Sequence, residues 1–159
     1  MDKIDHIELK HFTPEYIDKL HTFKLPEEQA KFTSLPSNYM EVATGQFRVV
    51  ILCGNDPVGF FLLHNTNRVN DYTDNPKAML LTSLSINHNQ QGKGYAKKAM
   101  SYLDKFVATE FPTCNEIVLA VNHKNTPAQD LYVKVGFQDT GRRKIGAIGE
   151  QFILSKRLK

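Results

Sequence analysis

The sequence contains no tryptophan, two cysteines and no long apolar run. Cys53 and Cys114 are too few for a disulfide framework, and their spacing does not resemble that of a metal site. No apolar stretch approaches the ~20 residues that a membrane-spanning helix needs, so we expect no membrane association. The start of the chain does not resemble a signal peptide, so we expect a cytoplasmic protein. From the cysteine spacing we expect no metal.

The sequence also lacks a strong charge of one sign. It has 20 basic and 17 acidic residues, a net charge of +3 and no long run of like charges. A nucleic-acid-binding protein needs a clustered basic face, so this balance excludes that class of partner. The length of 159 residues, with 41% apolar and 23% charged residues, is typical of a globular protein. We expect a single domain over residues 1–159.

Periodicity of the apolar residues predicts an α/β fold with a mixed sheet. We expect strands at 4–10, 46–53, 58–64, 78–86, 116–121, 137–144 and 151–158. We expect helices at 13–24, 25–32, 94–111 and 125–135, the first of them capped by Thr13. The stretch 78–86 is apolar on both faces for most of its length, which indicates a central strand covered on both sides.

A polar loop with two glycines, Gln91 to Ala96, follows this central strand and opens the helix after it. The unpaired N–H groups and the dipole at such a helix start favour a phosphate. The pattern is not a P-loop, because Lys93 is followed by Gly94 and Tyr95. It is not the dinucleotide fingerprint, because Lys97 occupies the position of the third glycine. A tight turn that binds nothing is the alternative reading.

The loop resembles a known motif. Gln91-Gly92-Lys93-Gly94-Tyr95-Ala96 matches the Gln/Arg-x-x-Gly-x-Gly/Ala motif of the GNAT N-acetyltransferase superfamily. A second segment is similar to the family's Asn-x-x-Ala-x-x-Leu-Tyr-x-x-x-Gly-Phe pattern, through Asn125, Ala128, Leu131, Tyr132, Gly136 and Phe137. The resemblance is sharp over 78–137 and vague over 1–45. It implies a GNAT-like three-layer αβα fold with a central splayed mixed β-sheet.

The resemblance implies acetyl-CoA as cosubstrate and indicates which residues would contact it. The pantetheine arm would pair with the backbone of Leu84 and Ile86, on the edge that the splay exposes. Asn125 resembles an asparagine that contacts the cofactor, although it also suits the N-cap of its helix. The pyrophosphate would lie on the loop and would also contact the lysine after it. The residues expected to contact it are Gln91, Gly92, Lys93, Gly94, Tyr95, Ala96 and Lys97.

Tyr132 holds the position of the family's general acid. Its phenol, with a reference pKa of about 10, would protonate the leaving thiolate. By helix pattern alone, Tyr132 would be a core residue. The general base stays unassigned, because 81–86 contains no acid. Water held by Ser83 or Ser85, loss of the proton to bulk water, and the acids Glu27, Glu28 and Glu41 are the alternatives considered.

The resemblance therefore predicts an acyltransferase that moves an acetyl group from acetyl-CoA directly to a primary amine. The acceptor would be an amino acid, a small amine, or a peptide or protein amine, and the loops at 20–45 and 144–150 that select it carry no motif. A non-catalytic CoA-binding or sensor domain of the same fold is the alternative. A homodimer through the last strands, with Phe152, Ile153 and Leu154, is a further expectation.

Overall fold

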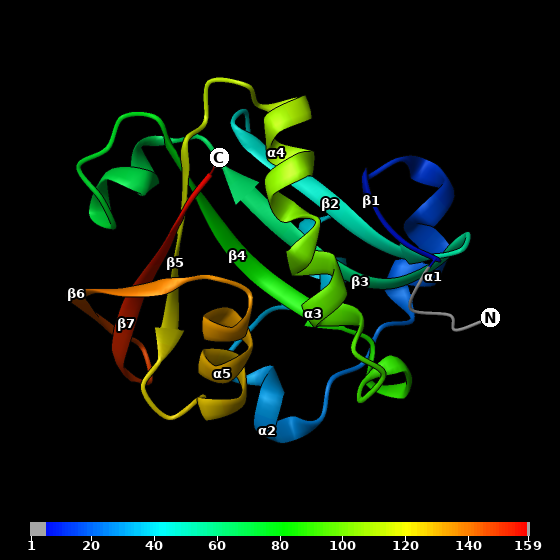
Figure 1. The fold of residues 1–159 in the computed structure, drawn as a ribbon. Coiled ribbons are helices and arrows are strands. Elements are labelled where there is room, and N and C mark those ends of the chain that lie inside the picture. Colours follow the sequence, from blue (N-terminus) through cyan, green and yellow to red (C-terminus); the bar gives the residue numbers. More distant parts are fainter. Residues whose placement is uncertain (1–5, 159) are drawn as a thin grey trace.

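The computed structural model describes residues 6–158, which form one seven-stranded sheet in the order β1-β2-β3-β4-β5-β7-β6 (Figure 1). Residues 4 and 5 of the first expected strand lie outside the described residues. The β4–β5 pair is parallel and every other neighbouring pair is antiparallel. The strands are β1 (Ile7–His11), β2 (Gln46–Cys53), β3 (Asp56–His64), β4 (Ala78–Ile86), β5 (Glu116–Asn122), β6 (Gln138–Gly146) and β7 (Gly149–Arg157).

Five α-helices and several short 3₁₀ helices connect these strands. The α-helices are α1 (Ile17–His21), α2 (Glu27–Ala30), α3 (Tyr95–Ser101), α4 (Leu103–Glu110) and α5 (Thr126–Lys134). The 3₁₀ helices are η2 (Pro14–Tyr16), η3 (Pro36–Tyr39), η4 (Asn67–Asp71) and η5 (His88–Gln90).

One face of the sheet packs against α3, α4 and α5 (Figure 1). Alternate side chains of each strand point to this face, as the two-residue period of a strand requires. From β4 and β5 they are Met79, Leu81, Ile117, Leu119 and Val121. The helices supply the buried residues Tyr95, Ala99, Met100, Leu103, Val107 and Tyr132. We call this side of the sheet the helix face.

The opposite face carries two smaller cores. Phe60 and Leu62 of β3 pack there with Leu20 of α1. Leu80 of β4 and Val118 of β5 pack there with other side chains, Val69 of η4 among them. Both sides of β3 and β4 are thus covered, which confirms the three-layer αβα fold and explains the nearly continuous burial of these strands.

The sheet splays between β4 and β5. Their pairing is limited to three residue pairs, from Ala78–Glu116 to Leu80–Val118. Beyond Leu80, β4 continues to Ile86 and β5 continues to Asn122 without pairing to each other. The splayed sheet expected from the resemblance is therefore confirmed. The gap exposes backbone groups on the inner edge of β4.

A β-bulge in β4 lies beside this gap. Phe60 of β3 opposes Ser85 and Leu62 opposes Thr82, so one residue of β3 faces two of β4. Ser83 accommodates the extra residue with a φ of +60°, in the left-handed region. The bulge changes the alternation: Leu81 packs toward the helix face, and so does Leu84. The side chains of Thr82 and Ser83, which lie between these two leucines in the sequence, point to the opposite face.

Two expected elements differ in the structure. The helix expected at 94–111 is divided at Tyr102 into α3 and α4. The Ser101 hydroxyl donates to the carbonyl of Lys98 (2.5 Å), and the N–H of Tyr102 donates to Ala99 (3.0 Å), so a 3₁₀-type turn interrupts the helix. Thr13 occupies the expected N-cap position, before the 3₁₀ turn η2, but its side chain makes no capping hydrogen bond, and its hydroxyl donates to the carboxylate of Glu15 instead (2.9 Å).

Candidate active site

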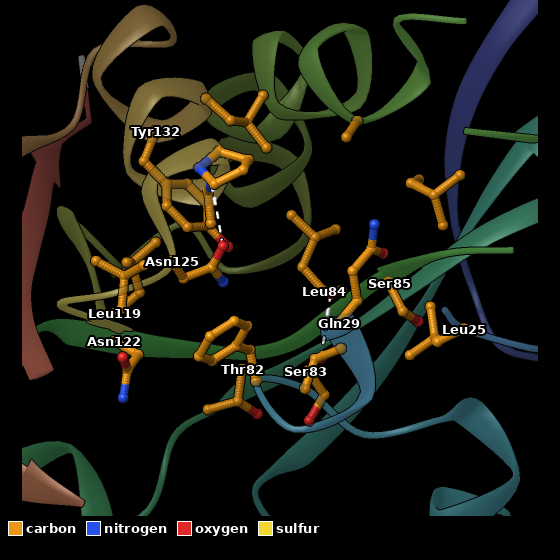
Figure 2. A pocket seen from close by; sticks show the side chains of 18 of the residues that line it. Leu25, Gln29, Thr82, Ser83, Leu84, Ser85, Leu119, Asn122, Asn125 and Tyr132 are labelled. Atoms are coloured by element: carbon orange, nitrogen blue, oxygen red, sulfur yellow. Dashed lines mark hydrogen bonds between the residues drawn. The ribbon is translucent and has the colours of Figure 1, made fainter. Parts of the chain in front are cut away.

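A cavity of about 890 Å³ fills the splay between β4 and β5 (Figure 2). This volume is in the range of small-molecule and cofactor sites. Its walls come from β4, β5, the glycine loop, α2, α5 and the β6–β7 hairpin. The cavity reaches both faces of the sheet, because the missing β4–β5 pairs leave an opening between them.

The glycine loop forms the end of the cavity at α3. Gly92 has a φ of +77° and Gly94 a φ of +81°, both in the region that only glycine adopts easily. A Cβ atom at Gly92 would meet no other atom within 4 Å, so this loop is open to its surroundings. Gly94 is the N-cap of α3, and the first amides of the helix have no carbonyl of their own helix to bind.

Gln91 connects the loop to two other parts of the site. Its Nε2 donates to the carbonyl of Ile86 (2.9 Å), which fixes the loop on the end of β4. Its amide also pairs in both directions with the amide of Gln29 in α2, at 3.0 and 2.9 Å. The short helix α2 is thus attached directly to the glycine loop.

The inner edge of β4 is partly occupied by side chains. The carbonyl of Leu84 accepts a hydrogen bond from Thr33 Oγ1 (3.1 Å), while that of Ile86 accepts from Gln91. A carbonyl oxygen has two lone pairs, so each can accept one further hydrogen bond. The segment after α2 therefore lies against the same edge that a ligand in the splay would use.

Tyr132 lies on the helix side of the cavity. Its side chain is 8% exposed, and its ring contacts that of Phe137 edge-on with 5.5 Å between the centroids. Burial raises the pKa of Tyr132 well above its ordinary value, because the phenolate would lose its hydration. The phenol therefore keeps its proton throughout the neutral range. Tyr132 is a core residue and a cavity wall at once.

Thr82 and Ser83 form the wall on the opposite side. Figure 2 shows them pointing away from Tyr132, on the other side of β4. Thr82 Oγ1 lies 2.6 Å from Nε2 of His64, which is 1% exposed. Ser83 Oγ donates to the hydroxyl of Tyr39 in η3 (3.2 Å). The bulge thus presents two adjacent hydroxyls to one side of the opening.

His64 is held neutral beside these hydroxyls. Burial, together with the positive charge of Arg68, lowers the pKa of His64 to about 4. Its Nδ1 is buried and has no hydrogen-bond partner. At pH values above that pKa, the neutral imidazole of His64 remains the hydrogen-bond partner of Thr82.

The model of the acetyltransferase (GNAT) family matches residues 9–137. The chain belongs to this family. The uncharacterized N-acetyltransferase YbbJ of Bacillus subtilis (strain 168) is 49% identical over 152 residues, which are 93% of this chain and 95% of that protein.

Solved GNAT structures share the fold. An aminoglycoside acetyltransferase in complex with coenzyme A and kanamycin has a TM-score of 0.74 at 17% identity and covers 95% of this chain and 94% of its own. Spermidine N-acetyltransferase from Vibrio cholerae, in complex with CoA and spermine, has a TM-score of 0.71 at 14% identity over 96% of each chain. At such low identity these two structures establish the fold of this acetyltransferase and no more.

The cavity of this acetyltransferase brings together nearly all the site residues expected from the sequence. They are Leu84, Ile86, Gln91, Gly92, Gly94, Tyr95, Ala96, Lys97, Asn125 and Tyr132. Lys93 is the exception: its side chain is exposed, and its Nζ donates to Gln90 Oε1 (3.2 Å). Of the three acids considered as bases, Glu28 is among the cavity-lining residues, and Glu27 and Glu41 are not.

Asn125 caps α5, as one of its two expected roles requires. Its Oδ1 accepts from the N–H of Ala128 at 3.4 Å. The cap uses the carbonyl oxygen of the side chain only, so the amide Nδ2 stays available to a ligand in the cavity.

Several residues of the site carry no motif in the sequence. Gln29 and Thr33 lie in the segment 20–45, which has no recognisable pattern. His64 ends an apolar strand, and Thr82 lies within another, so both resemble ordinary strand residues. The regular register of β3 with β4, in which Leu62 opposes Thr82 and His64 opposes Leu80, brings the side chains of His64 and Thr82 together.

Two negative findings concern residues 6–158. Within that range no group of three or more histidine, cysteine, aspartate or glutamate side chains is placed to hold a metal ion. None of the helices described there has the length and apolar character to span a membrane.

Proposed function

We propose that this protein transfers the acetyl group of acetyl-CoA directly to a primary amine bound in the same cavity. The splay beyond Leu80 and Val118 carries this proposal, because it opens a passage between the two faces of the sheet. A thioester reaching the passage from the helix face would meet an amine entering from the opposite face. Membership of an acetyltransferase family supports the same reaction.

The residues around the helix side fit acetyl-CoA. The glycine loop would hold the pyrophosphate through backbone amides, and Lys97 would add positive charge. The edge of β4 at Leu84 and Ile86 is not paired with a strand, and its carbonyls, which already accept from Thr33 and Gln91, can each accept one further hydrogen bond from an amide of the pantetheine arm. Acetyl-CoA supplies the activated acyl group, and residues of this chain would orient the two substrates and transfer the protons.

The chemistry assigns one step to Tyr132. The amine nitrogen attacks the thioester carbonyl carbon, the carbon–sulfur bond breaks, and the sulfur leaves with the electron pair. We assign the Tyr132 hydroxyl, which lines the cavity, as the proton donor for that sulfur, and the phenolate so formed would regain a proton from solvent as CoA leaves. An N–H of the β4 edge, most directly that of Leu84, would stabilise the developing oxyanion.

The amine must lose a proton before or during attack. Glu28 is the one carboxylate among the described residues that line the cavity, and it is exposed at the rim. Thr82 lies deeper, with its hydroxyl held by the neutral His64. In this arrangement bulk water at the rim, with Glu28 beside it, is the proton acceptor that the site provides.

A thermal-shift experiment tests the cofactor part of the proposal. CoA at about 100 times its Kd should stabilise the protein by about 2.7 kcal/mol, which raises Tm by roughly 5–10 °C. Gly92→Glu should abolish this shift by placing a carboxylate in the phosphate loop. Gly54→Glu is the matched control: Gly54 also has a positive φ and open space around a Cβ, but it lies in the β2–β3 turn.

A thiol-release assay beside the thermal shift separates an enzyme from a binding module. Release of free thiol from acetyl-CoA in the presence of amines supports acetyl transfer. A CoA shift without thiol release for any amine tested would favour a non-catalytic CoA-binding domain. Absence of a CoA shift in the wild-type protein would contradict the cofactor site itself.

A further inference from the structure

The side of the cavity opposite Tyr132 is nearly free of charge. We call it the acceptor wall and define it by Thr82, Ser83, Ala120, Asn122 and Ile148. Ala120 packs beside the core of the opposite face, and Asn122 lies two residues further along β5, so both side chains point to that face. Asn122 Nδ2 donates to the carbonyl of Ile148 (3.3 Å), which holds the β6–β7 hairpin tip at this wall.

The charged groups of the cavity stand at its rim. Among the described lining residues the acidic side chain is Glu28, and the basic ones are Lys31, Lys97 and Lys124. All four are exposed. Within the described lining, cations therefore outnumber carboxylates by three to one. Lys97 is already assigned to the pyrophosphate of acetyl-CoA, so Lys31 and Lys124 remain on the cationic side, and the single carboxylate of Glu28 offers little attraction to a ligand with several positive charges.

A polycation would find too few partners here. Each ammonium group of a polyamine or aminoglycoside has a pKa of the order of 10 and stays charged at neutral pH. One amine loses its charge in the reaction, but every other ammonium must enter beside neutral walls. Bringing a charge out of water without a partner is unfavourable. Hydroxyl, amide and apolar groups instead suit a neutral body.

We propose that the acceptor is a primary monoamine on an uncharged, partly apolar body, rather than a polyamine or an aminoglycoside. The hydroxyls of Thr82 and Ser83 would contact the amine, while Ala120 and Ile148 would contact its apolar part. This inference rests on the proposed acetyl transfer. The acceptor proposed here differs from the polycationic ligands named for the aminoglycoside and spermidine enzymes with the same fold.

Matched pairs of amines test the inference. Hexylamine and 1,6-diaminohexane have the same chain length and primary amine, and they differ in one ammonium group. Norleucine amide and lysine amide differ in the same way. We expect kcat/KM for thiol release from acetyl-CoA to be at least tenfold higher for the monoamine of each pair, with spermidine and kanamycin below both.

The outcomes separate this inference from the function on which it rests. Equal or higher kcat/KM for the diamines, spermidine or kanamycin would overturn the monoamine assignment and leave acetyl transfer intact. No transfer to any of these amines would overturn the proposed function, and the assignment with it.

A charge placed on the acceptor wall provides a second test. Ile148 is 46% exposed, so Ile148→Glu is compatible with folding and puts a carboxylate at the wall. We expect it to shift the kcat/KM ratio of each pair toward the diamine by about tenfold. Ile145→Glu is the control, because Ile145 is 76% exposed on the same hairpin and is not among the cavity-lining residues. Equal ratios in both variants would contradict the position of the wall.

Discussion

At the scale of single residues, Tyr132 has a structural role in the core and a proposed catalytic role. The same burial that makes its ring part of the helix-face core also keeps its hydroxyl protonated. A substitution that keeps the ring and removes the hydroxyl separates these two contributions. Phenylalanine has the required shape.

We expect Tyr132→Phe to lower kcat for acetyl transfer roughly 100-fold or more, the usual contribution of a general acid. The CoA-induced rise in Tm should be retained, since the ring and its contact with Phe137 remain. Tyr102→Phe is the control, because Tyr102 lies at the α3–α4 break and is not among the cavity-lining residues. Unchanged turnover in Tyr132→Phe would remove it from the acid role, and loss of the CoA shift would assign it to structure or binding.

His64 connects the stability of the fold to pH. Its pKa is about 4 in the folded protein and about 6.5 in an unfolded chain, so the unfolded state binds more protons between these values. The free energy of unfolding therefore falls as the pH drops from about 6.5 toward 4. The full loss is about 3 kcal/mol from this group.

Urea unfolding at pH 7 and pH 4.5 measures this effect. We expect the wild type to lose about 2–3 kcal/mol more than His64→Gln between the two pH values. Thr82→Val is the control, because it removes the partner of His64 but keeps the titrating imidazole. Equal pH dependence in the wild type and His64→Gln would show that His64 does not carry the effect.

At the scale of elements, the sequence predicted those parts whose signal is local. The apolar run of β4 has the bounds that its pattern predicts, and the glycines and the Asn125 cap mark the two helices beside the cavity. The break at Tyr102 was missed, because a serine hydroxyl bonding the backbone of its own helix leaves the apolar period intact.

The sequence pointed to 20–45, 144–150 and Ser83 for the proposed acceptor side, but it could not predict how Thr82, Gln29 and Thr33 are placed there, for a different physical reason. Thr82 and Ser83 acquire a common direction from the bulge, which depends on the register between β3 and β4. Gln29 and Thr33 gain their roles from contacts with residues more than fifty positions away. Such pairings leave no periodicity in the sequence, and the resemblance was vague over 1–45.

The Gln29–Gln91 amide pair joins the short helix α2 to the glycine loop. Four residues are too few for a helix to be stable by itself, so tertiary contacts must hold it. Two hydrogen bonds contribute about 1 kcal/mol each. We expect Gln29→Ala to accelerate amide hydrogen exchange over residues 25–33 by about tenfold or more.

Glu27→Ala is the matched control in the same helix, because Glu27 is exposed and is not among the cavity-lining residues. Its exchange should resemble that of the wild type. Similar exchange in all three proteins would mean that the amide pair does not hold α2 against the glycine loop.

At the scale of the whole molecule, the last strands bear on the homodimer. That assembly stays a prediction, and two of the side chains expected to form it are engaged elsewhere. Ile153 is 1% exposed and Leu154 is 3% exposed, and each packs in a core of its own chain. The edge strand beside β7 is β6, whose basic residues Arg142, Arg143 and Lys144 disfavour edge-to-edge pairing of two copies there.

The continuity of the sheet leads to a prediction for unfolding of the entire chain. All seven strands belong to one sheet, and apolar cores cover both of its faces. Loss of the central strands would therefore uncover both cores together. We expect residues 1–159 to unfold as a single domain, in one cooperative transition.

Two probes test this cooperativity. The chain has no tryptophan, so its fluorescence comes from six tyrosines, and Tyr16 and Tyr132 lie on opposite faces of the sheet. Urea midpoints from tyrosine fluorescence and far-UV circular dichroism should coincide, and CoA should move both by the same amount. Separate midpoints, or a CoA effect on one probe alone, would show that the cavity and the rest of the sheet unfold independently. Coincidence is expected because β4 carries the inner edge of the cavity and the centre of the sheet in one strand.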